Sequence, residues 1–220
     1  MKRKVLVVDD HPIVREGLAQ MINRETDLSV CGAAADMHTA LQLIEGLRPD
    51  ILIVDISLEG PDGLDLLKHI RTQDPGLPVL ILSMHDESIY AERALRAGAN
   101  GYIMKQEATD NVLDALRRIL NREVYVSPNI ANKMLQQFVG ATATDKSHSS
   151  VDDLSDRELE VLRLIGAGHG TRQIAEELHL SMKTVETYQA HLKEKLVLRN
   201  SRELVQYATR WTMRARAAEA

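Results

Sequence analysis

The chain has 220 residues, of which 44% are apolar and 27% are charged, and its formal net charge is −5. This composition is typical of globular proteins, and the length is sufficient for two domains. The single cysteine, Cys31, excludes a disulfide framework, and no apolar run approaches the roughly 18 residues of a membrane span or resembles a signal peptide. We therefore expect a cytoplasmic protein that makes no contact with a membrane.

Residues 4–121, within a predicted first domain of residues 1–121, alternate short β-branched runs with segments in which apolar residues recur every three or four positions. This alternation is typical of an α/β fold, in which helices cover both faces of a parallel sheet. The run Ile51–Val54 is apolar throughout, as expected of a central strand that is buried on both faces. We predict a doubly wound, five-stranded parallel sheet with strands at Lys4–Asp10, Leu28–Ala34, Asp50–Asp55, Pro78–Ser83 and Gly101–Met104.

The first predicted helix follows the first strand. Pro12 suits its first turn, because the amide hydrogen that proline lacks has no helical partner at that position. The spacing of Ile13, Gly17, Leu18 and Met21 predicts that these four residues form the stripe that faces the sheet.

Polar residues are expected to gather at one edge of this sheet. Asp9 and Asp10 close the first predicted strand and Asp55 closes the third. Ligands of doubly wound sheets bind at the carboxyl ends of the strands, and carboxylates crowded there are stabilised by a divalent cation such as Mg²⁺. Ser83 and Lys105, which follow the fourth and fifth strands, add a hydroxyl and an ammonium. This set suits phosphoryl transfer, in which a carboxylate attacks phosphorus while cations neutralise the charge.

Each of these residues also has a simpler interpretation. An aspartate at a strand end is commonly a helix cap or part of a solvated turn, and Lys105 alone is more often a surface lysine. The prediction of a site therefore depends on all five residues meeting at the same edge.

Residues 4–121 resemble the receiver domains of bacterial response regulators, which have a flavodoxin-like fold. The resemblance is carried by Val7-Val8-Asp9-Asp10-His11, Val54-Asp55 with Asp62-Gly63, Leu82-Ser83, and Gly98-Ala99 with Gly101-Tyr102 and Lys105.

The resemblance implies a role for each residue of the pocket. Asp55 is implied to accept a phosphoryl group from a histidine kinase, and Lys105 to bind the oxygens of that group. Ser83 and Tyr102 are the implied switch pair, and Ser57 and His85 lie where family members tune autodephosphorylation. The implied ligands of the cofactor Mg²⁺ are Asp9 in an assisting role, Asp10, Asp55 and the carbonyl of Ser57.

The composition changes after residue 121. Residues 122–150 read as a linker with a weakly helical first half, and the sequence does not indicate which domain this helix contacts. Residues 151–220 are helical, beginning with a capping box at Ser155 and Glu158. Residues 1–121 contain 19 acidic and 13 basic residues, whereas 151–220 contain 11 of each, so charge alone neither supports nor excludes nucleic-acid binding by the second domain.

Residues 154–208 resemble the LuxR-type helix-turn-helix domain of the NarL/FixJ subfamily. The matching residues are Leu154-Ser155, Arg157-Glu158, Glu160-Val161-Leu162, Ile174-Ala175, Leu178, Ser181, Lys183-Thr184-Val185, Lys195-Leu196 and Arg199-Asn200. The pattern predicts a short helix, a turn at His179-Leu180, and a longer helix after Ser181 that can enter the major groove of DNA.

The longer helix contains the predicted DNA contacts. Lys183 and Thr184, at its start, suit phosphate contacts, since a helix N-terminus attracts anions. Base edges or backbone are expected partners of Glu186, Thr187, Gln189 and Lys193, although these side chains alternatively form only a solvated face. Core positions are predicted for Val185, Tyr188 and Leu192. Val197 stands where relatives usually have a glycine, and either a strained left-handed residue or a shifted turn would result.

We therefore predict a transcription regulator rather than an enzyme acting on other substrates. Phosphorylation of Asp55 would control binding to double-stranded DNA by releasing the DNA-binding domain, by promoting dimerisation, or by both, and the exposed part of Glu203–Arg214 is a candidate dimer surface. One alternative is an aspartyl-phosphate hydrolase, but Ser57 stands where such enzymes usually carry a second carboxylate. The other is a regulator with a vestigial phosphorylation site, which disagrees with the presence of every pocket residue.

Overall fold

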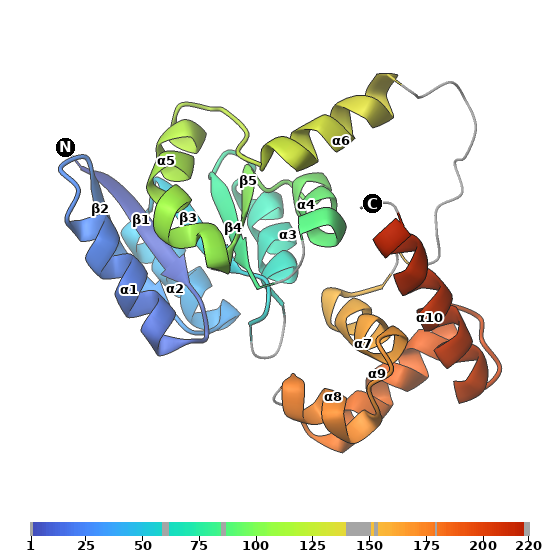
Figure 1. Cartoon of the computed structure of the whole chain (residues 1–220). Helices are drawn as coiled ribbons and strands as arrows, with labels where there is room; N and C mark the ends of the chain where they lie inside the picture. The colour runs from blue at the N-terminus through green and yellow to red at the C-terminus, as the bar shows by residue number, and fades with distance from the viewer. Residues whose placement is uncertain are drawn as a thin grey trace. The chain divides into compact units, whose positions relative to one another are not determined.

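The computed structural model describes residues 2–58, 62–84, 87–139, 151, 154–178 and 180–217. The chain divides into two compact units, residues 1–142 and 143–220 (Figure 1). Among the helices of the described residues, none combines the length and the apolar composition that a bilayer crossing requires.

The first unit contains a parallel sheet with the strand order β2-β1-β3-β4-β5. This order confirms the predicted doubly wound α/β fold. The strands are β1 Arg3–Val8, β2 Leu28–Ala34, β3 Ile51–Asp55, β4 Val79–Ser83 and β5 Gly101–Met104. The first strand is shorter than predicted, because the amide of His11 donates to Asp9 Oδ1 at 2.8 Å and the chain turns there into the first helix.

Helices cover both faces of this sheet. The helical segments are α1 Pro12–Asn23, α2 Met37–Leu47, α3 Gly63–Gln73, α4 Glu87–Arg96, the short 3₁₀ segment η1 Lys105–Glu107, and α5 Ala108–Leu120. Figure 1 shows α1 and α5 in front of the sheet and α2 and α3 behind it. Pro12 occupies the first turn of α1, as predicted.

Alternate strand residues form the core beneath α1 and α5, since successive side chains point to opposite faces of a sheet. From the strands these are Val5, Val7, Ile51, Ile53, Leu80, Leu82 and Ile103, and they meet Leu18, Ile22, Val112, Leu116 and Ile119 from the helices. Burying one such side chain is worth about 1.5–3 kcal/mol. The cluster therefore holds the strand ends that bear the pocket residues.

The predicted inward stripe of α1 was wrong in part. Ile13 is 84% exposed and Gly17 is also exposed, whereas Leu18 and Ile22 are buried with Val14 and Met21 packed beside them. Ile13 lies about 140° around the helix from Leu18, since each residue turns the chain by about 100°. Spacings of three and four residues permit two overlapping stripes, and packing on the sheet selected the other one.

The segment after α5 belongs to the first unit. The amide of Tyr102 in β5 donates to the carbonyl of Tyr125 at 2.9 Å, and the amide of Tyr125 donates to the carbonyl of Asn100 at 3.0 Å. The following helix, α6 Pro128–Val139, packs against α4, and Ser127 Oγ donates to Glu87 Oε1 at 2.7 Å. The structure thus answers what the sequence left open, namely which domain this helix contacts.

The second unit is a bundle of helices α7 Asp156–Gly166, α8 Thr171–Glu177, α9 Met182–Lys195 and α10 Ser201–Ala217. The predicted capping box at Ser155 and Glu158 begins α7. α7 packs closely on α10, because a Cβ atom at Gly166 would lie 2.5 Å from the carbonyl oxygen of Ala208. The predicted turn at His179-Leu180 includes a residue outside the described part of the chain.

Val197 adopts the left-handed conformation, with φ of 54°, and its side chain is 87% exposed. The amide of Val197 donates to the carbonyl of Glu194, and the amide of Leu198 donates to that of Lys193. These two bonds form a Schellman motif, whose left-handed position usually requires glycine. Of the two predicted outcomes, the strained residue is the one observed.

Candidate functional site

The register of the sheet brings the predicted pocket residues to one edge. Val8 is paired with Val54, so Asp9 and Asp55, the next residue of each chain segment, lie side by side. Asp55 is paired with Leu82 and Ser83 with Met104, so Ser83 and Lys105 come next along the same edge. Four of the strands, β1, β3, β4 and β5, therefore deliver carboxylates, a hydroxyl and an ammonium to one end of the sheet.

Lys105 lies between two buried carboxylates. Its Nζ is 2.7 Å from Asp9 Oδ2 and 2.7 Å from Asp55 Oδ2, and the side chains of all three residues are buried. Buried charges are stable only when they are paired. A surface role for Lys105, the simpler interpretation of the sequence, is thus excluded.

Burial and neighbouring charges shift the pKa values of Asp55 and Lys105. Burial raises the pKa of Asp55, the neighbouring Asp9 raises it further, and the ammonium of Lys105 opposes both. Burial alone would lower the pKa of Lys105, but the carboxylates of Asp55 and Asp9 outweigh it and raise the pKa above its ordinary value. Lys105 therefore stays protonated at neutral pH.

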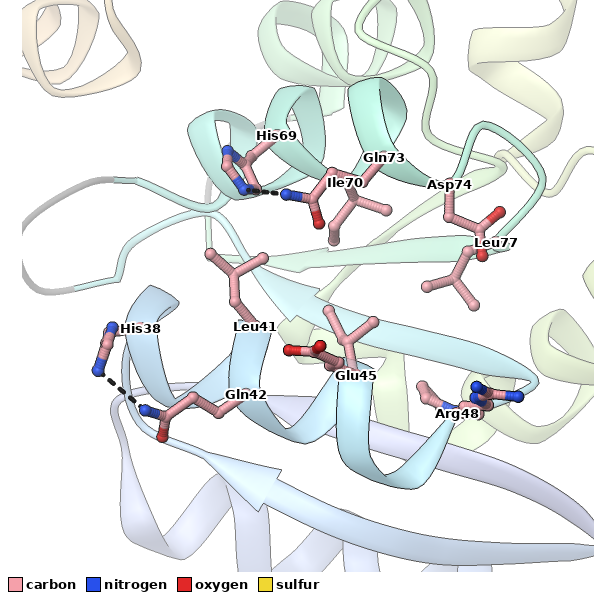
Figure 2. A pocket seen from close by; sticks show the side chains of 12 residues that line it. His38, Leu41, Gln42, Glu45, Arg48, His69, Ile70, Gln73, Asp74 and Leu77 are labelled. Carbon is pink, nitrogen blue, oxygen red and sulfur yellow. Dashed lines mark hydrogen bonds between the residues drawn. The ribbon is translucent and has the colours of Figure 1, made fainter.

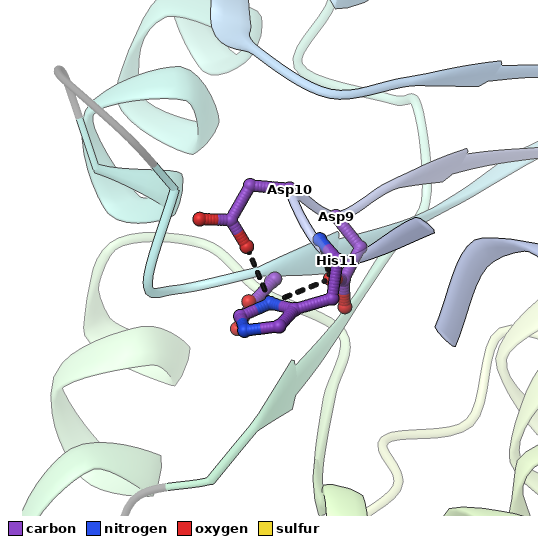
Figure 3. Close-up of side chains that lie close together, drawn as sticks. Asp9, Asp10 and His11 are labelled. Carbon is purple, nitrogen blue, oxygen red and sulfur yellow. Dashed lines mark hydrogen bonds and ion pairs between the residues drawn. The ribbon is translucent and has the colours of Figure 1, made fainter. Parts of the chain in front are cut away.

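A carboxylate and imidazole cluster completes the pocket (Figure 3). Single ligand atoms of Asp9, Asp10, His11 and Asp55 all lie within 4.8 Å of one another, and no other group of this kind occurs among the described residues. His11 Nδ1 is 2.6 Å from Asp10 Oδ1, and the amide of Ser57 donates to Asp55 Oδ1 at 3.2 Å. The three predicted carboxylates are thus brought together at the position where a cation was predicted.

Two residues of the pocket had no role assigned from the sequence. His11 directly follows the aspartates, so its position in the chain was a usable signal. Arg15 lies in α1 and donates from Nη1 to the backbone carbonyl of Asp9, and no local pattern indicates that contact. Both residues hold the loop that carries Asp9 and Asp10.

The predicted switch residues are inside the protein. Ser83 is fully buried and Tyr102 is 1% exposed. Ile81 is paired with Tyr102 and Ser83 with Met104, so Ser83 and Tyr102 lie diagonally on the same face of neighbouring strands. His85 lies outside the described residues.

A groove of about 680 Å³ lies between α2 and α3, away from this edge (Figure 2). Its lining includes Leu41, Ile70 and Leu77. Each helix also carries a histidine paired with a glutamine one turn along, His38 with Gln42 and His69 with Gln73. Its two acidic residues, Glu45 and Asp74, come from different elements. The groove therefore gathers no set of groups comparable to that of the acidic pocket.

In the second unit, α9 presents the predicted DNA contacts. Ser181 caps the helix by accepting from the amide of Thr184 at 3.0 Å. Lys183, Glu186 and Thr187 are exposed along one side, which is the spacing of neighbours on one helix face. Val185 and Leu192 are buried as predicted, whereas Tyr188 is only half-buried.

The remaining predicted contacts are less accessible. Gln189 is half-buried and donates from Nε2 to Thr171 Oγ1 of α8 at 3.2 Å. Thr184 is half-buried beside the capping serine, and Lys193 is half-buried near the end of the helix. Only part of the predicted set therefore shares one exposed face.

The receiver-like sheet with its acidic pocket, together with a helix-turn-helix bundle, defines a DNA-binding response regulator. The chain matches the response regulator receiver domain family over residues 5–117 and the bacterial regulatory proteins of the luxR family over residues 152–208. It belongs to the response regulators of the NarL/FixJ type, and it is a transcription regulator.

Relatives cover both units of the chain. The oxygen regulatory protein NreC of Staphylococcus epidermidis RP62A is 39% identical over 209 residues, which are 93% of this chain and 96% of that protein, and NreC of Staphylococcus carnosus is 38% identical with the same coverage. Among solved structures, a LuxR-family response regulator from Aurantimonas sp. SI85-9A1 is 37% identical over 63% of this chain and 99% of its own, with a TM-score of 0.58. RcsB from Salmonella enterica serovar Typhimurium, bound to a promoter in the presence of a phosphomimetic, is 26% identical over 95% and 99%, with a TM-score of 0.58.

Proposed function

We propose that Asp55 accepts the phosphoryl group that controls this regulator and that a histidine kinase is the donor. The supporting observation is the buried contact of Asp55 with Lys105 at the end of the central strand. An Asp55 carboxylate oxygen attacks phosphorus, so that a P–O bond forms while the P–N bond of the phosphohistidine breaks. The ammonium of Lys105 then binds the new phosphoryl oxygens and stabilises their charge.

The pocket also fits a divalent cation. Three carboxylates converge there, and the single charge of Lys105 offsets at most one of them. Hard oxygen donors of this kind suit Mg²⁺. The residues that would hold it are Asp9, Asp10, Asp55 and the carbonyl of Ser57, and the bound ion would supply positive charge to the phosphoryl oxygens.

Labelling with acetyl phosphate and Mg²⁺ tests the acceptor. We expect the wild-type chain to gain one phosphoryl group by mass spectrometry and Asp55→Asn to gain none. Asp65→Asn is a matched control, because this acidic residue lies on α3 and pairs with Lys68 outside the pocket. Equal labelling of Asp55→Asn and the wild type would exclude Asp55 as the acceptor, whereas a wild type that gains no phosphoryl group would favour a vestigial site.

Ser83 and Tyr102 are the proposed route of the signal out of the pocket. Both are buried, and the backbone amide of Tyr102 is bonded to Tyr125, which precedes α6. Movement of β5 on phosphorylation would therefore reach the segment that leads toward the second unit.

Helix α9 is the proposed recognition helix for double-stranded DNA. Lys183, at its first turn, would contact phosphate, and Glu186 and Thr187 on the same exposed face would meet base edges or backbone. The half-buried Thr184, Gln189 and Lys193 would contribute only at the margin of the contact. RcsB, bound to promoter DNA as described for that protein, supports this assignment.

The dependence of DNA binding on salt tests this interface. We expect Lys183→Ala to reduce the slope of log affinity against log salt by about 1, since one phosphate contact is lost. Lys68→Ala removes the same charge from α3 of the first unit and should leave the slope unchanged. An unchanged slope in Lys183→Ala on mixed-sequence duplex DNA would remove Lys183 from the interface.

A further inference from the structure

His11 brings to the pocket an imidazole, a group that has no role in the proposed phosphoryl transfer. Its imidazole lies in the acidic pocket, with Nδ1 2.6 Å from Asp10 Oδ1 and 3.3 Å from Asp9 Oδ1. The ring is 58% exposed, so packing does not hold it there. What holds it is its contact with the two carboxylates, together with the backbone amide of His11, which donates to Asp9 Oδ1 at 2.8 Å.

We propose that His11 Nδ1 makes this pocket a mixed nitrogen and oxygen site that binds a first-row transition metal ion such as Zn²⁺ or Co²⁺ more tightly than Mg²⁺. The inference rests on the proposed function, because it concerns the ion of the same pocket. Mg²⁺ prefers oxygen ligands and keeps its waters, whereas imidazole is a favourable ligand for zinc, nickel and cobalt.

The observed distances are compatible with one shared ion. Ligand atoms about 2.0–2.2 Å from a metal are separated by about 2.8 to 4.4 Å from one another, depending on the coordination geometry. The distance from His11 Nδ1 to Asp9 Oδ1 lies inside this range, and the contact with Asp10 needs to lengthen by only a few tenths of an ångström. The largest separation in the cluster, at most 4.8 Å, needs a contraction of similar size.

The two oxygens of Asp9 serve different partners. Asp9 Oδ2 contacts Lys105, while Oδ1 contacts His11 on the other side of the carboxylate. A metal on the His11 side therefore does not have to displace Lys105 from Asp9. The carboxylates of Asp10 and Asp55 border the same space and complete a ligand set of one imidazole and three carboxylates.

Calorimetric titration of the full chain with Zn²⁺, Co²⁺ and Mg²⁺ tests whether the pocket binds the first two ions more tightly than Mg²⁺. We expect His11→Asn to lower the Zn²⁺ and Co²⁺ affinities at least about tenfold more than the Mg²⁺ affinity, since the nitrogen donor that Zn²⁺ and Co²⁺ prefer is lost. His38→Asn is the matched control, because His38 lies on α2 in the groove lining and pairs with Gln42. The control should match the wild type for all three ions.

Proton NMR of the Co²⁺ complex tests direct coordination. A coordinated imidazole gives strongly shifted ring-proton resonances, which we expect in the wild type and in His38→Asn but not in His11→Asn. If these resonances are absent from the wild type, or if the Zn²⁺ and Mg²⁺ affinities fall equally in His11→Asn, then His11 only positions Asp10 and the inference is overturned. Failure of Mg²⁺ to support labelling of Asp55 would instead count against the proposed function.

Discussion

Lys105 offsets the negative charge of the carboxylates that are buried in the pocket. One ammonium contacts Asp9 and Asp55, and the remaining carboxylate, Asp10, is more exposed and lies against His11. Without Lys105, the two buried carboxylates would lose the ammonium that both of them contact. The residue that binds the phosphoryl group in the proposed reaction thus also balances the charge of the buried carboxylates.

Val197 carries a strain that a single substitution can remove. Its left-handed backbone costs about 1–2 kcal/mol relative to glycine, and its exposed side chain makes little compensating contact. We expect Val197→Gly to raise the free energy of unfolding of the second unit by about this amount. Urea denaturation followed by the fluorescence of Trp211, the only tryptophan in the chain, measures it.

Val197→Ala serves as the control at the same position. Alanine retains the Cβ atom that causes the strain, so its stability should remain close to that of the wild type. Equal stabilisation by alanine and glycine would show that the β-branched side chain, rather than the left-handed backbone, causes the cost.

At the level of elements, the connection from β3 to α3 sets the position of Asp55. Asp62 caps α3 by accepting from the amide of Asp65, and the amide of Gly63 donates to the carbonyl of Ile56 at 2.8 Å. A Cβ atom at Gly63 would lie 2.0 Å from the carbonyl oxygen of Asp55. Only a glycine permits the helix start to approach the acceptor strand this closely.

We therefore expect Gly63→Ala to displace the backbone of Asp55, to destabilise the first unit by about 1–3 kcal/mol and to slow its labelling by acetyl phosphate. Thermal unfolding by circular dichroism and the rate of labelling measure the two effects. Gly46→Ala, in an open position on α2, should instead stabilise the helix by about 0.5–1 kcal/mol with normal labelling. Normal labelling in Gly63→Ala would show that the loop relaxes without moving Asp55.

The connection from α5 to α6 makes long-range contacts that short-range sequence patterns do not predict. The helical pattern of Asn129–Val139 was visible in the sequence, but its partner was not. Two contacts place α6 in the first unit. Tyr125 pairs with β5, and Ser127 donates a hydrogen bond to Glu87 of α4. These contacts join residues far apart in the chain, so no local periodicity records them.

At the level of the whole molecule, phosphorylation is proposed to promote a homodimer that binds DNA. A solved structure of RcsB holds two dimers of that protein bound to two parallel DNAs. Light scattering should show that acetyl phosphate with Mg²⁺ raises the mass of the wild type toward twice that of the monomer, while Asp55→Asn stays unchanged. A dimer of the same stability in Asp55→Asn would mean that association does not depend on the phosphoryl group.

The sequence by itself determined the fold class, the strands and the residues that meet at the edge of the sheet. It could do so because strand periodicity is local and because parallel strands end at a common edge, which brings Asp9, Asp55 and Lys105 together. The same local rules predicted the cap at Ser155, whereas the strained position of Val197 was predicted from the resemblance to LuxR-type domains.

Only the tertiary structure decided which stripe of α1 is buried, which unit α6 joins, and which groups contact one another in the pocket. Two overlapping stripes on α1 satisfy the same spacing, and the packing of the sheet chose the one without Ile13. Likewise, Gln189 is bonded to α8 rather than presented with Lys183. These outcomes depend on distances between residues far apart in the chain, which the order of the residues does not specify.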